Sequence, residues 1–182
     1  MTTICQLSNP IAIAVTGIAG SGKTTLGRAI AVALRAPLLD LDSLTNPLLD
    51  HLEGALGGHW LGGAYAAQVR AGRYAVMRET AKDALRGAGA VVMVAPFTAE
   101  LQGGAGWAAL TQALAPAEIR VVHIDGDPEL FAARRAQRGA ARDAHRPEDA
   151  APRIGVDVIR VDARLSTDRQ LDCVLAVLQS ES

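Results

Sequence analysis

One stretch of the chain has the residue types and spacing of a nucleotide-binding loop. Residues 17–24 read Gly-Ile-Ala-Gly-Ser-Gly-Lys-Thr, a complete G-x-x-x-x-G-K-[ST] phosphate-binding motif. Its glycines let backbone N–H groups approach phosphate oxygens, Lys23 can reach the β- and γ-phosphates of ATP, and the Thr24 hydroxyl can ligate Mg²⁺. The residues predicted to bind the nucleotide here are Gly17, Ala19, Gly20, Ser21, Gly22, Lys23, Thr24 and Thr25.

Two carboxylates, Asp40 and Asp42, follow the short apolar segment that begins at Leu38. We expect them at the carboxyl edge of a parallel sheet, where ligands bind in such folds, with strand alternation placing both on one side. Asp40 would then support Mg²⁺, and Asp42 would act in catalysis by accepting the proton of a substrate hydroxyl. The alternatives are that Asp42 only caps a following turn or that one carboxylate is merely solvated.

An acid that often helps to hold Mg²⁺ in phosphate-loop proteins is missing from its usual place, the end of the strand beside the loop strand. If Ala90–Ala95 is that strand, the place falls on Ala95 or Pro96. Asp125 also follows an apolar run, but it directly precedes an arginine-rich helix and is expected to shape that turn. The metal-side acid is therefore assigned to Asp40, with Asp125 as the fallback.

A cluster of arginines in the C-terminal half is a candidate for binding phosphate charge. Arg134, Arg138 and Arg142 follow one another at i,i+4 spacing, so they share one face if the helix continues. We expect Arg134 to contact the nucleotide, and Arg138 and Arg142 to stabilise charge on the transferred phosphate, with residues Gly139–Arg153 forming a lid. The alternative is a solvated helix face balanced by nearby acids.

A second group of arginines lies in the middle of the chain. Arg70, Arg73 and Arg78 are spaced along a helical pattern, and a guanidinium can bind an anionic or carbonyl-bearing substrate with two hydrogen bonds. The equal alternative is the polar face of an amphipathic helix. The preceding segment Glu53–Gly63 is rich in glycine and is predicted to be a substrate-side loop or lid.

Apolar strand patterns alternate with helical patterns along the chain. Strands are predicted at Ile11–Val15, Leu38–Leu41, Ala90–Ala95, Ile119–Ile124 and Val156–Val161. Helices are predicted from Lys23 to about Arg35, as a turn over Pro47–Leu52, over Tyr65–Gly87 with an interruption near Gly72, as a broken helix over Thr98–Leu114, from Pro128 to about Arg138 and over Thr167–Leu178. This order predicts an α/β, three-layer P-loop NTPase fold with a mostly parallel five-stranded sheet and helices on both faces.

The overall composition narrows the function classes. The length of 182 residues fits a single domain, and the net charge of −1 gives no reason to expect binding to nucleic acid or a membrane. No signal peptide or long apolar span appears, and Cys5 and Cys173 have no metal-type spacing, which favours a reducing cytoplasm. The composition leaves open whether the chain is a monomer or a homodimer.

In combination these features resemble small P-loop kinases of the nucleoside-monophosphate-kinase-like group. Asp40-Leu41-Asp42 is similar to the Asp-x-Asp of shikimate kinases, whose first Asp serves Mg²⁺ and whose second binds the reacting hydroxyl. Asp42-Ser43-Leu44 resembles the segment that carries the catalytic base in chloramphenicol phosphotransferase. The segment Val94–Phe97, together with the arginine cluster, is similar to bacterial predicted kinases of the AAA family. The resemblance implies a lid that closes over ATP, and an adenine site near Asp162–Asp168.

These observations predict an ATP- and Mg²⁺-dependent kinase that phosphorylates a hydroxyl of a small metabolite or natural product. One alternative is a nucleotide-binding regulatory or switch ATPase whose hydrolysis is stimulated by a protein partner. Another is a toxin-like kinase of the zeta type that acts on an activated sugar. The sequence does not identify the phosphate acceptor.

Overall fold

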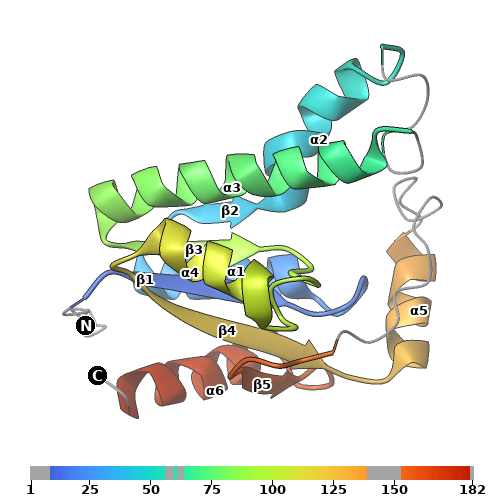
Figure 1. Ribbon diagram of the computed structural model, residues 1–182. Helices are drawn as coiled ribbons and strands as arrows, with labels where there is room; N and C mark the ends of the chain where they lie inside the picture. Colours follow the sequence, from blue (N-terminus) through green and yellow to red (C-terminus); the bar gives the residue numbers. More distant parts are fainter. Residues whose placement is uncertain (1–8, 56–59, 61–63, 139–152, 181–182) are drawn as a thin grey trace.

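The computed structural model describes residues 9–55, 60, 64–138 and 153–180. Its centre is a five-stranded sheet of order β2-β3-β1-β4-β5, in which every neighbouring pair is parallel (Figure 1). The strands are β1 (Ile11–Thr16), β2 (Leu38–Asp40), β3 (Ala90–Val94), β4 (Glu118–Asp125) and β5 (Ile159–Asp162). The helices are α1 (Lys23–Leu34), α2 (Leu41–His51), α3 (Ala66–Ala88), α4 (Gly104–Leu114), α5 (Pro128–Arg138) and α6 (Thr167–Ser180).

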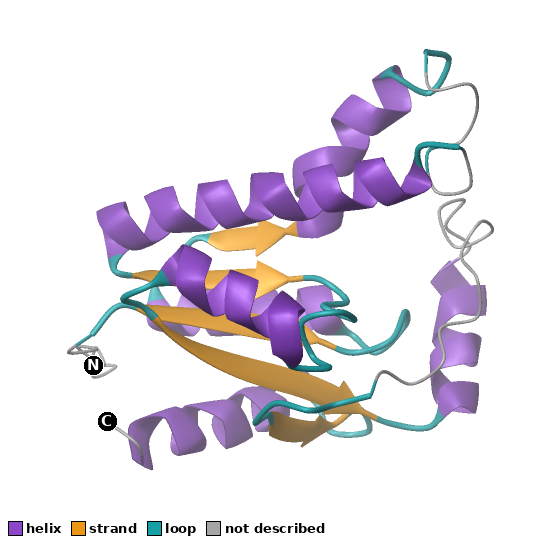
Figure 2. Ribbon diagram, in the orientation of Figure 1, coloured by secondary structure: helices purple, strands orange, loops and turns teal. Residues whose placement is uncertain are grey.

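Helices cover both faces of this sheet, as Figure 2 shows. On β1 the side chains of Ile11, Ile13 and Val15 face α1 and α6, while Ala12 and Ala14 face α3 and α4. The β1 side chains alternate between the two faces of the sheet because successive side chains of a strand point in opposite directions. Both faces are apolar because helices cover both. The predicted three-layer α/β fold with a parallel five-stranded sheet is confirmed.

Helix α1 lies very close to the sheet because of one glycine. A Cβ at Gly27 would come within 2.4 Å of Val94 Cγ2 on β3, so no larger residue fits at this crossing. Helix α1 is thereby held against β3, and the phosphate loop joins its start to the carboxyl end of β1.

Two predicted elements in the first half of the chain were wrong in detail. Pro47 lies inside α2 rather than at its start, because the helix begins six residues earlier, at Leu41. The Asp40 carboxylate caps this start by accepting hydrogen bonds from the N–H groups of Asp42 and Ser43. Gly72 does not interrupt α3, which runs unbroken from Ala66 to Ala88. A helix tolerates one glycine at a cost of about 1 kcal/mol, and the buried α3 residues Tyr74, Met77, Ala81 and Leu85 offset that cost.

Two elements in the second half were also misplaced. Residues 98–102 are turns and Gly103 is the N-cap of α4, so the segment predicted as a broken helix from Thr98 is helical only from Gly104. The last strand is β5 at Ile159–Asp162, three residues later than its predicted start. The preceding residues instead cross toward α4, where the Gly155 N–H donates to the Leu101 carbonyl at 2.7 Å.

Candidate functional site

The phosphate loop joins β1 to α1 and leaves the start of that helix uncovered. Gly22, the N-cap of α1, has φ +99° and offers no side-chain acceptor to the first turn, which also contains no acidic residue. A left-handed backbone of this kind favours glycine. The first N–H groups of a helix have no partner within the helix, and its dipole favours negative charge there. The open start of α1 therefore fits a phosphate group.

Helix α5 lies against the other side of the loop. A Cβ at Gly20 would approach the Phe131 carbonyl oxygen to 2.5 Å, and Arg135 Nη1 donates to the Ala19 carbonyl at 2.7 Å. Arg135 also belongs to the arginine cluster of the sequence, but no individual role was predicted for it, because nothing in the motif signals a contact made across 116 positions. The contact turns the Ala19 carbonyl toward the guanidinium and fixes the loop from outside.

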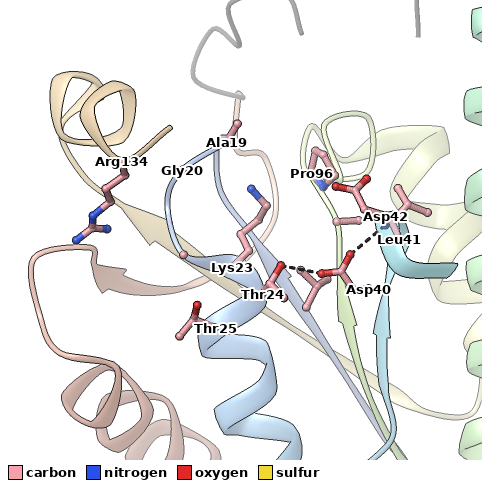
Figure 3. Close-up of a pocket in the computed structure, with 13 residues that line it drawn as sticks. Ala19, Gly20, Lys23, Thr24, Thr25, Asp40, Leu41, Asp42, Pro96 and Arg134 are labelled. Atoms are coloured by element: carbon pink, nitrogen blue, oxygen red, sulfur yellow. Dashed lines mark hydrogen bonds between the residues drawn. The ribbon is translucent and has the colours of Figure 1, made fainter. Parts of the chain in front are cut away.

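The side chains of the loop serve different purposes. Lys23 Nζ donates to the Ile18 carbonyl at 2.8 Å, so the ammonium group is held over the loop (Figure 3). Ser21 is 1% exposed, and its hydroxyl has no hydrogen-bond partner among the described residues. The Ser21 N–H donates to the Ile18 carbonyl at 3.2 Å, so Ser21 closes the turn of the loop.

A carboxylate joins the loop to the next helix. Thr24 Oγ1 donates to Asp40 Oδ2 at 2.7 Å, while Asp40 Oδ1 caps α2 (Figure 3). Asp40 comes from β2, which pairs with β3. Strand β3 ends at Val94, and the Ala95-Pro96 that follows contains no acid, as expected from the sequence. Asp40 thus supplies from the next strand the carboxylate that the end of β3 does not.

The fallback acid, Asp125, is placed elsewhere. Its carboxylate lies 2.9 Å from Arg160 Nη1 and 2.8 Å from His123 Nδ1, at the end of β4. Burial is the main cause that lowers the pKa of His123, and the nearby Asp125 charge opposes this shift. Asp125 does not line the cavity formed by the phosphate loop. Of these two acids, Asp40 alone lines that cavity.

Asp42 lies in the first turn of α2 and is held by Arg73 of α3. Arg73 Nη2 lies 2.6 Å from Asp42 Oδ1, and the two side chains are 10% and 25% exposed, respectively. The strand-alternation argument for pairing Asp40 with Asp42 was wrong, because the chain turns helical at Leu41. Both carboxylates nevertheless line the same cavity, since a helix cap and the second residue of that helix are close in space.

The cavity of about 290 Å³ brings together most of the predicted donor-side residues (Figure 3). Its lining consists of Ala19, Gly20, Gly22, Lys23, Thr24, Thr25, Asp40, Leu41, Asp42, Val94, Ala95, Pro96 and Arg134. Gly17 and Ser21 belong to the loop but do not line the cavity. Arg134 also donates to the Ala163 carbonyl at 2.9 Å, which joins α5 to the turn after β5.

The arginines of α3 do not line this cavity, although Arg73 pairs with Asp42, which does. Arg70 is exposed, donates to the Thr98 hydroxyl and lies over the Tyr74 ring, 5.5 Å from its centroid. Arg78 lies eight residues after Arg70 on α3 and is partly exposed. Several predicted positions fall outside the described residues. They are the side chain of Arg138, all of Arg142, residues 139–152 of the predicted lid Gly139–Arg153, and residues 56–59 and 61–63 of the Glu53–Gly63 loop.

The segment after β3 links the cavity to Arg70, since Ala95 and Pro96 line the cavity and Thr98 accepts a hydrogen bond from Arg70. Phe97 has φ +48°, unusual for a residue with a side chain, and its N–H donates to the Tyr74 hydroxyl at 3.0 Å. Burial is the largest cause that raises the pKa of Tyr74 to about 12, so this hydroxyl keeps its proton at neutral pH. Thr16 Oγ1 donates to the Pro96 carbonyl at 2.8 Å. Two side chains from other elements thus hold a strained corner of the backbone.

The parallel sheet and the phosphate loop together place the fold in the class of small P-loop kinases. A sequence profile of the AAA domain family matches residues 13–154, well over half of the chain, and the chain belongs to this family. A search of curated protein sequences finds no significant match. None of the described helices has both the length and the apolar character needed to cross a membrane.

Solved structures share this fold over nearly their whole length. A candidate kinase from Chloroflexus aurantiacus J-10-fl is 24% identical, with a TM-score of 0.70, over 96% of this chain and 98% of its own. A gluconokinase from Sinorhizobium meliloti 1021 is 23% identical, with a TM-score of 0.64, over 94% and 93%. An APS kinase from Mycobacterium tuberculosis, in complex with AMPPNP and APS, is 21% identical, with a TM-score of 0.63, over 94% and 98%. The expected resemblance to small P-loop kinases is confirmed.

Proposed function

We propose that this protein is an ATP- and Mg²⁺-dependent kinase that transfers the γ-phosphoryl group to a hydroxyl of a small molecule. The observation that carries the proposal is that one cavity is lined by the phosphate loop with Lys23 and also by the carboxylate of Asp42. The fold shared with a gluconokinase and an APS kinase adds support.

The donor side would bind the nucleotide mainly through backbone groups. The uncapped N–H groups of α1 would receive the phosphates, Lys23 would leave the Ile18 carbonyl for a phosphate oxygen, and Arg134 would approach the nucleotide from α5. We also propose, from their spacing in the sequence, that Arg138 and Arg142 neutralise charge on the transferred group.

The oxygen donors beside the loop fit Mg²⁺. Thr24 and Asp40 would hold the ion, since Mg²⁺ prefers a few oxygen ligands and keeps water and phosphate oxygens for the rest. The described residues contain no cluster of three or more His, Cys, Asp or Glu side chains that could hold a metal ion. Such a site matches an ion that arrives with ATP. When bound, Mg²⁺ would screen the negative charge of the phosphates.

The acceptor hydroxyl would hydrogen-bond to Asp42. Its oxygen would form a bond to the γ-phosphorus as the bond from that phosphorus to the bridging oxygen breaks and ADP leaves; the hydroxyl proton passes to Asp42. The pairing with Arg73 suits Asp42 for orienting the hydroxyl, because the loose transition state of phosphoryl transfer needs little help from a strong base. Arg70, exposed and hydrogen-bonded to Thr98, is the proposed contact for an anionic or carbonyl group of the acceptor.

The test is to incubate the protein with γ-labelled ATP, Mg²⁺ and a metabolite extract, and to separate labelled small molecules from free phosphate. The proposal predicts label on a small molecule, lost in Asp42→Ala and kept in Asp83→Ala, an exposed acid on α3. Label found only in free phosphate would contradict the kinase and favour a switch ATPase. Label on an activated sugar would point to the toxin-like alternative.

A further inference from the structure

Arg73 is the centre of a closed hydrogen-bond network between α2 and α3. Its Nε donates to Thr45 Oγ1 at 2.8 Å, and its Nη2 donates to Asp42 Oδ1 at 2.6 Å and to Asn46 Oδ1 at 3.0 Å. Three acceptors at positions i, i+3 and i+4 of one helix thus hold a single guanidinium. Three of the five guanidinium N–H donors, those of Nε and Nη2, are thus used within the chain, and the two of Nη1 remain.

The flat face of the same guanidinium is also covered. The Arg73 Cζ atom lies 4.7 Å from the centre of the buried Trp60 ring, and Trp60 Nε1 donates to Asp50 Oδ1 at 3.0 Å. Asp50 belongs to α2, so the indole is held by the same helix that presents Asp42. Stacking on an aromatic ring suits arginine better than lysine. Only 10% of the Arg73 side chain remains exposed.

Arg70, one turn earlier on α3, is placed quite differently. It is exposed, its hydrogen-bond partner is the neutral hydroxyl of Thr98, and no carboxylate of the described residues lies within ion-pair distance of it. Two arginines on the same face of one helix therefore have opposite environments. The charge of Arg73 is used inside the protein, and the charge of Arg70 faces outward.

We infer that Arg73 is a positioning residue: it fixes the carboxylate of Asp42 toward the cavity and does not bind the acceptor. The inference rests on the proposed function. Asp42 is then held at both ends, since its N–H donates to the Asp40 carboxylate while its own carboxylate is paired with Arg73. A side chain fixed in this way has lost its rotamer freedom before the substrate arrives, which lowers the entropic part of the barrier.

A double-mutant cycle on phosphoryl transfer separates this role from substrate binding. The variants are Arg73→Met, Asp42→Asn and their combination, with Arg86→Met as the matched control from an exposed ion pair on the same helix. The acceptor source is the metabolite fraction that receives label from the wild-type protein, added at increasing dilution to give an apparent KM. The readouts are kcat, this KM and the melting temperature.

A positioning role predicts that Arg73→Met lowers kcat by roughly 10–100-fold, as a misplaced catalytic group does, with the apparent KM little changed. The combined variant should then be no slower than Asp42→Asn alone, because Arg73 acts only through Asp42. Arg73→Lys should recover part of kcat, since an ammonium can pair with Asp42 but cannot reach all three acceptors.

A raised KM with kcat kept, or losses that multiply in the combined variant, would overturn the inference and make Arg73 a substrate ligand. If Arg73→Met does not fold, the same cycle is run with Arg73→Lys, which retains the charge. If the wild-type protein labels no small molecule, the proposed function itself fails and the positioning role fails with it. A wild-type protein that transfers label but shows multiplied losses refutes the positioning role alone.

Discussion

The two sides of the cavity are built in opposite ways. On the donor side, the start of α1 is uncapped, and the loop before it presents backbone groups and left-handed glycines. On the acceptor side, the start of α2 is closed by Asp40, and the carboxylate of Asp42 is closed by Arg73. The open helix start suits a ligand that brings its own negative charge. The closed one suits a carboxylate that must already be in place when a neutral hydroxyl arrives.

The difference shows which interactions fix the geometry of each half of the site. The donor half depends on backbone conformation, so a single glycine or the single lysine of the loop decides it. The acceptor half depends on contacts between side chains of α2 and α3, so removal of one member leaves its partner buried and unpaired. Substitutions can therefore damage one half and spare the other.

The largest effect should come from removing the positive charge of the donor side. We expect Lys23→Met to lower label transfer by about 10²–10³-fold, the usual cost of losing one group that stabilises developing charge. Lys82→Met is the control, because this other lysine is paired with Glu79 at 2.6 Å on the outside of α3. Equal losses in the two variants, measured as initial rates, would show that Lys23 has no special role.

A smaller effect should follow from adding one methyl group to the loop. Gly20→Ala forces a Cβ against the Phe131 carbonyl oxygen and requires a left-handed alanine, since φ is +87°. We expect a loss of about 2 kcal/mol in the free energy of unfolding and weaker binding of a nonhydrolysable ATP analogue. Gly87→Ala, in the exposed end of α3 with open space around it, should be neutral or stabilising. Urea unfolding and calorimetry check both, and unchanged binding in Gly20→Ala would contradict the backbone cradle.

Two substitutions can separate the two contacts of Asp40, its hydrogen bond with Thr24 and its cap of α2. Asp40→Asn keeps an acceptor for the cap of α2 but loses the charge beside Thr24, so we expect a Mg²⁺ requirement raised about tenfold with little change in stability. Asp40→Ala should lose about 1 kcal/mol more, because alanine cannot cap. Titration of label transfer with Mg²⁺ measures the first effect, and an unchanged Mg²⁺ requirement in Asp40→Asn would exclude Asp40 from the metal site.

The smallest expected effect concerns the segment that follows β3. Tyr74→Phe removes the acceptor of the buried Phe97 N–H, which should lower the free energy of unfolding by about 1–2 kcal/mol without altering nucleotide binding. Tyr65→Phe, at an exposed position, is the control. No loss of stability in Tyr74→Phe, measured by urea unfolding, would mean that the Phe97 corner does not depend on this hydrogen bond.

The sequence predicted the strand–loop–helix arrangement around residues 17–24 because that arrangement is local. Backbone geometry at a strand–helix junction requires glycines at fixed positions, and these stand in one unbroken motif from Gly17 to Thr24. The alternation of strands and helices likewise predicted the parallel sheet, since buried parallel strands are continuous apolar runs. The pairing of Asp40 with Thr24 was expected only as a shared metal role, and the structure adds the hydrogen bond between them.

The acceptor half was harder to predict because its contacts join distant residues. Arg73 and Asp42 are 31 positions apart, and a helical arginine next to other arginines has the same pattern whether it binds substrate, solvent or an acid of the chain. The start of α2 was missed for a related reason: an apolar strand that ends in Asp-x-Asp is compatible with two more strand residues or with a capped helix. Only the packing of α3 beside α2 decides between these.

The central claim is that one cavity has a nucleotide half and an acceptor half that act separately. The direct measurement uses a single preparation of Asp42→Asn, assayed both for binding of a nonhydrolysable ATP analogue with Mg²⁺ and for label transfer to a small molecule, beside wild type. The account predicts analogue affinity within about twofold of wild type, because Asp42 makes no ground-state contact with the nucleotide, and label transfer lowered by about 10²-fold, the low end of what a positioned proton acceptor contributes. Label transfer at the wild-type rate, or loss of analogue binding together with transfer, would contradict it.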